Sequence, residues 1–104
     1  MIKIGVIGAG TMGNGIAHVS ALSGIEVTLV DINPEFLKKA LLTISKNMNR
    51  QVQKEKLSSE DKDSAIQKIS TSTEMISLVD CDIVVEAATE DFKIKSSIFR
   101  QLDE

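Results

Sequence analysis

The chain contains few of the side chains that mark specialised binding or redox chemistry. Its 104 residues include no Trp, no Tyr, three Phe, one Cys, one Pro and one His. So few aromatic side chains leave no stacking platform for single-stranded nucleic acid, and a net charge of −3 argues against a nucleic-acid partner. A single cysteine excludes an internal disulfide and indicates a reducing, cytoplasmic environment.

Long hydrophobic runs are also missing. No apolar stretch approaches the length of a membrane span, and the first residues follow a strand pattern and not that of a signal peptide. The hydrophobic fraction of 42% and the charged fraction of 26% are ordinary for a globular protein. We therefore predict one domain over residues 1–104, with no membrane partner and no metal site.

The N-terminal stretch organises the chain. A buried strand pattern ends at Ile7 and runs directly into three spaced glycines, Gly8, Gly10 and Gly13. Gly8 permits a tight turn, Gly10 lets a pyrophosphate approach the backbone, and Gly13 lets the next helix pack closely on the strand. The pyrophosphate would lie on the N-terminus of that helix. The predicted phosphate-binding turn comprises Gly8, Gly10, Thr11, Met12 and Gly13.

Strand and helix patterns alternate along the rest of the chain. This order predicts an α/β fold, a Rossmann-type parallel sheet with helices on both faces. The first strand should lie between the second and the fourth, with the third outside the second. The expected strands are 2–7, 25–30, 69–72 and 82–88, and the expected helices are 11–23, 34–54 and 59–67, with a last helix capped by Asp91 and carrying Ile94, Ile98, Phe99 and Leu102 on one face.

Asp31 supplies the second half of a dinucleotide-binding pattern. It ends the second expected strand, eighteen residues after Gly13, near the spacing of about 20 typical of the acid that binds the adenosine ribose. A carboxylate there accepts from both ribose hydroxyls and repels a 2′-phosphate, which favours NAD over NADP. The alternative is a solvated acid at a strand end.

Three segments together resemble a known family. The segment Gly8–Ala17, the pair Val30-Asp31 and the segment Val84–Lys95 are similar to the N-terminal NAD-binding domain of the 3-hydroxyacyl-CoA dehydrogenases, and most of all to the bacterial 3-hydroxybutyryl-CoA dehydrogenases. The resemblance covers nearly the whole chain. It implies that Glu90 contacts the nicotinamide end of NAD and that Lys95 reaches the nicotinamide ribose or a nearby phosphate; otherwise both are surface charges beside a helix start.

The segment from residue 38 to residue 56 is strongly basic. It holds six of the twelve cations and one acid, so its net charge is +5 and that of the remainder is −8. The family resemblance implies that this helix binds coenzyme A through the positions of Asn47 and Lys54, although Asn47 stands where the family often has serine. A solvated polar face is the alternative.

Catalytic residues are not expected in this chain. Oxidation of a 3-hydroxyacyl thioester needs a base, most naturally a histidine. The only histidine, His18, falls inside the first helix, away from the strand ends, and is interpreted as structural or solvated. The resemblance implies that the catalytic histidine and its acidic partner follow after the length covered here, in a C-terminal catalytic and dimerisation region.

The sequence therefore predicts the NAD-binding part of a 3-hydroxyacyl-CoA dehydrogenase, inactive alone, acting on acyl-CoA in fatty-acid or butyrate metabolism. We expect the fold to stop after the fourth strand, whose unpaired apolar edge would favour a homo-oligomer. Two alternatives remain open: another dehydrogenase with a similar turn, of the 3-hydroxyisobutyrate or 6-phosphogluconate type, or a nucleotide-sensing module without catalysis.

Overall fold

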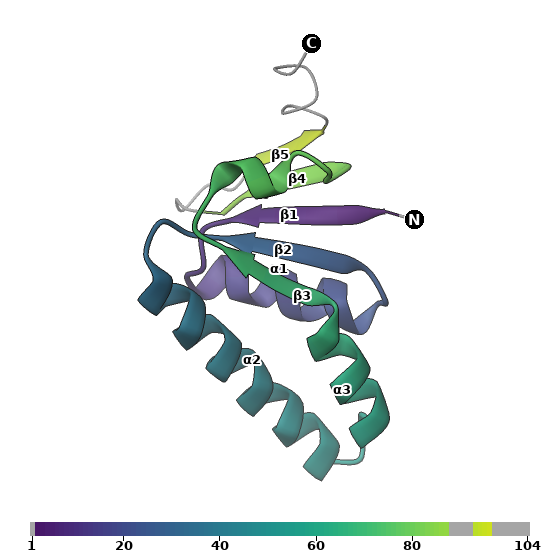
Figure 1. Cartoon of the computed structure of the whole chain (residues 1–104). Coiled ribbons are helices and arrows are strands. Elements are labelled where there is room, and N and C mark those ends of the chain that lie inside the picture. The colour runs from purple at the N-terminus through teal and green to yellow at the C-terminus, as the bar shows by residue number, and fades with distance from the viewer. Residues whose placement is uncertain (1, 88–92, 97–104) are drawn as a thin grey trace.

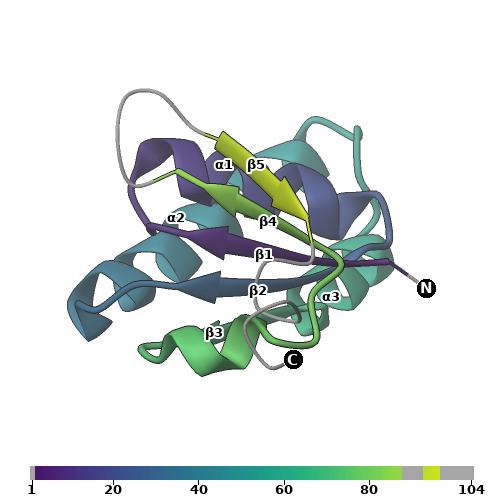
Figure 2. The same cartoon turned by 90° about the horizontal axis from the view of Figure 1, so that it is seen from above.

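The fold is a twisted five-stranded sheet with helices packed on it (Figures 1 and 2). The computed structural model describes residues 2–87 and 93–96. The strand order is β3-β2-β1-β4-β5, and the first four strands run parallel. The strands are β1 Lys3–Ile7, β2 Glu26–Val30, β3 Ile69–Ser72, β4 Ile83–Glu86 and β5 Lys93–Ser96.

Helices α2 and α3 begin where local sequence signals place them. At the start of α2, the Asn33 side chain accepts a hydrogen bond from the Glu35 N–H, and Pro34 occupies the first helical position. At the start of α3, Ser58 accepts from the Asp61 N–H. The helices are α1 Thr11–Leu22, α2 Pro34–Gln53, α3 Ser59–Gln67 and the 3-10 helix η1 Met75–Leu78.

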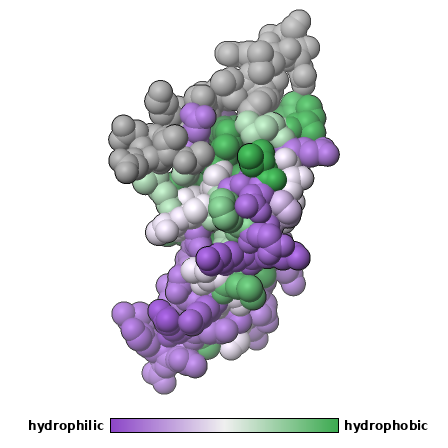
Figure 3. Space-filling model, turned by 90° about the vertical axis from the view of Figure 1, so that its left-hand side faces the viewer, coloured by the Kyte–Doolittle hydropathy of each residue, from purple (hydrophilic) through white to green (hydrophobic). Residues whose placement is uncertain are grey.

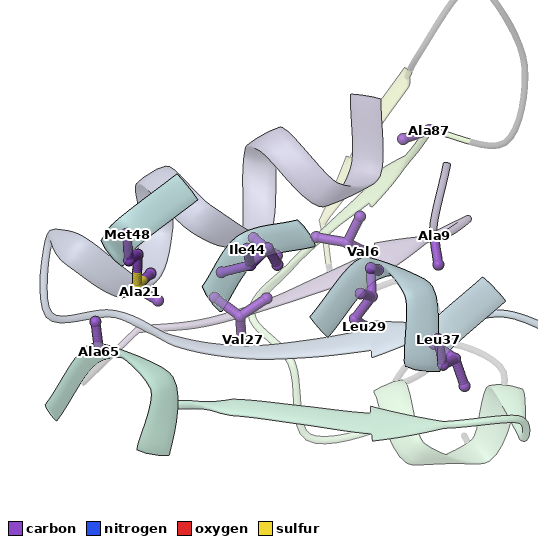
Figure 4. Packing of buried hydrophobic residues seen from close by; sticks show 12 residues of the cluster. Val6, Ala9, Ala21, Val27, Leu29, Leu37, Ile44, Met48, Ala65 and Ala87 are labelled. Carbon is purple, nitrogen blue, oxygen red and sulfur yellow. The ribbon is translucent and has the colours of Figure 1, made fainter. Parts of the chain in front are cut away.

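The two faces of the sheet are covered unequally. All three α-helices pack on one face in a single apolar cluster, in which Met48 of α2 lies with Ala21 of α1 and Ala65 of α3 (Figure 4). On the other face, Leu78 of η1 and Cys81 cover the sheet in a smaller cluster. The second half of α2 and α3 extend past the sheet as an arm (Figure 1).

The predicted architecture is confirmed for the first four strands and three helices. Each observed boundary lies within two residues of the expected one up to Glu86. Strand β1 lies between β2 and β4, and β3 lies outside β2. The short 3-10 helix η1 lies between β3 and β4.

The prediction of a last helix is wrong for residues 93–96, the part of it that the structure describes. Residues 93–96 form β5, which pairs antiparallel with β4 so that Ile94 lies opposite Val85. The four residues alternate Lys-Ile-Lys-Ser, a pattern that fits a strand as well as a helix turn, and the open edge of β4 decides between them because its unpaired backbone groups need partners. The expectation of an unpaired edge on β4 is wrong for the same reason. Asp91, Ile98, Phe99 and Leu102 lie outside the described residues.

Candidate cofactor-binding site

The turn after β1 has the conformation that its glycines require. Gly8 adopts φ 101°, a left-handed region that favours glycine. Its N–H donates to the carbonyl oxygen of Val30 at 2.7 Å. This bond joins the turn to the end of β2. Because β1 and β2 are parallel, the turn lies at the carboxyl edge of the sheet, where open α/β folds bind their ligands.

Gly13 lies in a tightly packed place, whereas Gly10 lies beside open space. A Cβ built on Gly13 would lie 1.8 Å from the carbonyl oxygen of Gly8, so α1 approaches the turn too closely for any side chain there. A Cβ on Gly10 would meet nothing within 4 Å. Gly13 thus serves close packing within the protein, whereas the bare backbone at Gly10 faces open space that a ligand can use. The close packing at Gly13 is the one that the spacing predicts.

The N-terminus of α1 is prepared for an anion. Its N-cap is Gly10, which makes no side-chain cap, and its first turn contains no acidic residue. Helices α2 and α3 are both capped by side chains and carry acids in their first turns. The first N–H groups of α1, including those of Thr11 and Met12, have no partner within the helix and lie at its positive end. A pyrophosphate fits this arrangement.

Asp31 is fixed beside the turn. Its Oδ2 accepts from the N–H of Ala9 at 2.9 Å, and its Oδ1 accepts from the N–H of Asn33 at 2.9 Å. Each carboxylate oxygen can accept a second hydrogen bond, so two ribose hydroxyls can still bind. The structure therefore brings the predicted ribose-binding acid to the predicted phosphate-binding turn.

One side chain at this edge was not found by sequence reasoning. Ile32, directly after Asp31, is 87% exposed. A large apolar side chain this exposed, next to the carboxylate, offers a flat adenine ring a surface to pack on. The sequence could have indicated this side chain, because Ile32 follows the end of the expected strand at Val30 and is therefore not needed in the sheet.

A groove of about 540 Å³ continues from the turn between α1 and α2. Asn14, Gly15 and His18 line it from α1, and Lys39, Thr43 and Asn47 line it from α2. None of the residues that line it is acidic. Of the two predicted coenzyme A contacts, Asn47 therefore lies in the groove. Lys54 is exposed at the C-cap of α2, beyond the lining.

The basic side chains of α2 are largely without ion-pair partners. Within the described part of the chain, Lys38 forms an ion pair with Glu35 at 3.9 Å, and no other cation of α2 is in one. The side of the molecule on which α2 lies is mostly hydrophilic over the arm (Figure 3). Lys39 in a groove without acids, and further unpaired cations on the same helix, make this surface suited to an anionic ligand.

The remaining predicted residues are placed only in part. Glu90 lies outside the described residues. The backbone of Lys95 lies in β5, opposite Val84 of β4. His18 is half-buried, with Nε2 3.1 Å from Oε1 of Gln51. Among the described residues there is no cluster of three or more His, Cys, Asp or Glu side chains. No described helix is both long and apolar enough to cross a membrane.

Fold and site together define a dinucleotide-binding domain of the Rossmann type. The family described as "3-hydroxyacyl-CoA dehydrogenase, NAD binding domain" matches residues 3–104. The chain belongs to this family, and its cofactor is NAD.

Relatives and solved structures agree with this assignment. A 3-hydroxybutyryl-CoA dehydrogenase of Bradyrhizobium diazoefficiens is 46% identical over 100 residues, which are 96% of this chain and 34% of the relative. The crystal structure of (S)-3-hydroxybutyryl-CoA dehydrogenase PaaH1 from Ralstonia eutropha superposes with a TM-score of 0.83 at 45% identity, covering 86% of this chain and 31% of that one. A 3-hydroxybutyryl-CoA dehydrogenase from Escherichia coli gives 0.83 at 38% identity, covering 86% and 19%. The chain thus spans about a third of the length of the curated relative that it matches at 46% identity.

Proposed function

We propose that this chain is the NAD-binding part of an enzyme that oxidises (S)-3-hydroxyacyl-CoA to 3-oxoacyl-CoA, in fatty-acid or butyrate metabolism. The observation that carries the proposal is the Asp31 carboxylate held against the phosphate-binding turn, in a domain of the 3-hydroxyacyl-CoA dehydrogenase family. Family membership favours this function over a 3-hydroxyisobutyrate or 6-phosphogluconate type of dehydrogenase and over a sensing module.

The chain's own residues bind and orient in this proposal. NAD, when bound, accepts the hydride from the hydroxyl-bearing carbon of the substrate. The α1 N-terminus at Gly10 holds the pyrophosphate, and Asp31 holds the adenosine ribose. Glu90 and Lys95 would act at the nicotinamide end, following the resemblance of the segment that contains them.

Proton removal from the substrate hydroxyl is assigned to a residue outside this chain. His18 is engaged by Gln51 between two helices, and it sits two turns into α1 and not at the carboxyl edge of the sheet. We therefore propose that the chain alone binds NAD without turning over a hydroxyacyl-CoA.

Coenzyme A is proposed to bind along α2. Asn47 offers an amide to the groove, and Lys54, seven residues further, lies on the same side of the helix. The exposure of Lys54 and the lack of acids in the groove lining support binding of the ligand's phosphates. We also propose a cytoplasmic location, which the buried free thiol of Cys81 supports.

We propose a homo-oligomer because of exposed apolar side chains, and not because of an unpaired strand edge as the sequence predicts. The edge of β4 is covered by β5, but large apolar side chains remain exposed, with Leu42 at 71% and Ile76 at 63%. Sedimentation at several concentrations measures the association. A single monomeric species throughout would contradict it.

Calorimetry with NADH, NADPH and acetoacetyl-CoA, beside an assay of hydroxyacyl-CoA oxidation, tests the function. We expect NADH to bind more tightly than NADPH, acetoacetyl-CoA to bind, and no turnover. Turnover by this chain alone would overturn the assignment of the base to another part of the protein.

A matched pair of lysine variants tests the coenzyme A site. Lys54→Gln should weaken binding of acetoacetyl-CoA about fivefold at low salt, because it removes a phosphate partner. Lys38→Gln removes the same charge from the same helix but from a lysine already paired with Glu35, so it should change the affinity little. Equal effects of both variants would mean that only the overall charge of the helix matters.

A further inference from the structure

We propose that helix α1 forms the second wall of the acyl-CoA site, with Gly15 leaving space for the ligand and His18 holding α2 in position. The inference rests on the proposed function, which places the ligand on α2. It adds two residues of α1, neither of which belongs to the phosphate-binding turn.

No packing contact within the described chain requires a glycine at position 15. It lies inside α1, where glycine is a poor helix former compared with alanine. A Cβ built on it would meet nothing within 4 Å, in contrast with the 1.8 Å at Gly13 two residues earlier. The residue is exposed and lines the groove between α1 and α2. The missing side chain therefore keeps space open in the groove and not between elements of the fold.

His18 joins the groove to the far end of α2. It lies three residues after Gly15 on the same side of α1 and also lines the groove. Its Nε2 is 3.1 Å from Oε1 of Gln51. An amide oxygen can only accept, so this contact is a hydrogen bond in the tautomer whose hydrogen is on Nε2.

The partner of His18 lies among the basic residues of α2. Arg50 precedes Gln51, and Lys54 follows it by three residues. Asn47, Arg50 and Lys54 are spaced by three and four residues, so they continue along one side of the helix from the groove lining. A hydrogen bond at Gln51 therefore fixes the helix at the point where the groove gives way to the two cations.

Apart from this hydrogen bond, this part of α2 is held by apolar packing against α1 and α3. The helix extends past the sheet there (Figure 1), and its buried side chain in that region is Met48, which packs in the cluster of Figure 4. Apolar packing is not directional, whereas a side-chain hydrogen bond has a defined length and angle. His18 is thus a positioning residue for the anion-binding side of α2.

Gly15→Ala separates a ligand role from a structural one. In a helix with open space around the new methyl group, this substitution should raise the midpoint of urea unfolding. The proposal expects the same variant to bind coenzyme A at least fivefold more weakly and NADH with unchanged affinity. Asn49→Ala, an exposed substitution on α2 away from the groove lining, should raise stability and leave both affinities unchanged.

His18 is tested by two replacements and a double-mutant cycle. His18→Leu and Gln51→Leu should each weaken coenzyme A binding about fivefold, and the double variant should add little to either, because both remove the same hydrogen bond. His18→Gln, whose amide can donate to Gln51, should recover much of the affinity. NADH affinity should stay unchanged in all of them. Since His18 is the only histidine, its ring signals in an NMR spectrum are assigned without further work, and coenzyme A should shift them.

The outcomes distinguish this inference from the proposed function. Binding of coenzyme A to the unaltered chain, with equal affinity in Gly15→Ala and His18→Leu, would overturn the role of α1 and leave the proposed function standing. NADH binding without any coenzyme A binding would overturn the site on α2 and the inference with it. Parallel losses of coenzyme A and NADH affinity in His18→Leu would make His18 merely structural and overturn its positioning role.

Discussion

The carboxylate of Asp31 accepts a hydrogen bond from the backbone N–H of Ala9 at 2.9 Å, across 22 residues of sequence. The bond connects the residue that would bind the ribose with the turn that would bind the pyrophosphate. Because the N–H of Asn33 donates to the other carboxylate oxygen, the side chain is held at both oxygens by backbone groups of the protein. The contacts therefore fix the predicted ribose-binding carboxylate beside the predicted phosphate-binding turn, and a site held in place by the protein loses less entropy when a ligand binds.

The first prediction follows from this double contact. Asp31→Asn keeps the shape of the side chain but removes its charge and one of its two acceptor oxygens. We expect NADH to bind about tenfold more weakly, since a hydrogen bond to a charged group contributes about 1.5–3 kcal/mol. We also expect the preference for NADH over NADPH to shrink, because the repulsion of a 2′-phosphate is lost. Calorimetry with both cofactors measures this.

The matched control is Asp80→Asn, which removes an exposed acid from the turn after η1. It should leave both affinities unchanged. An Asp31→Asn variant that discriminates against NADPH as strongly as the unaltered chain would contradict the assigned role of the carboxylate.

The second prediction compares two glycines three residues apart. Gly13→Ala should destabilise the fold by about 3 kcal/mol, because the new Cβ would lie 1.8 Å from the Gly8 carbonyl oxygen and backbone atoms would have to move. Gly10→Ala should change stability by less than about 1 kcal/mol, since its Cβ meets nothing within 4 Å, but it should weaken NADH binding at least tenfold. Urea unfolding and calorimetry measure the two effects. Weak NADH binding by both variants with intact stability would contradict the division of roles.

The conformation of the glycine turn was predictable from sequence because each of its requirements restricts one position. Gly8 adopts a left-handed backbone conformation, position 13 has no space for a side chain, and Asp31 must lie at the end of the next strand. Each requirement restricts the residue type at a fixed spacing, so the pattern predicts the geometry. The helix starts at Pro34 and Ser59 were predictable for the same reason.

Features that depend on packing between distant segments were not predictable. The strand at residues 93–96 forms because β4 offers an unpaired edge, which the sequence of those four residues does not encode. The groove is likewise a property of two helices together: Gly15 and His18 are unremarkable along α1, and they become lining residues only when α2 lies opposite. The contact of His18 with Gln51 spans 33 residues and has no sequence signature.

The third prediction concerns the pH dependence of stability. Cys81 is 3% exposed, and this burial raises the pKa of its thiol, while the side chain of Thr28 and the charge of Lys3 partly oppose the shift. The folded state therefore holds its proton more tightly than the unfolded state, so stability is unaffected below the ordinary thiol pKa of about 8.5 and falls as pH rises above it. Urea midpoints at pH 7.5 and 9.5 measure the fall. Cys81→Ala should show a smaller fall, and an equal fall in both proteins would assign it to other groups.

The fourth prediction uses two helix ends with the same backbone motif. At the end of α1, Gly24 adopts φ 85°, its N–H donates to Ala21, and the next N–H donates to Ser20. At the end of α2, Glu55 takes the place of the glycine with φ 59°, and it is the one non-glycine residue with positive φ in the described part of the chain. Glu55→Gly should therefore stabilise the fold by about 1 kcal/mol, since a side chain in this conformation costs about 1–2 kcal/mol, partly offset by glycine's greater freedom when unfolded. The urea midpoint measures the gain. Lys56→Gly, one residue later without a positive φ, should lower it, and a lower midpoint in Glu55→Gly would contradict the strain assigned to Glu55.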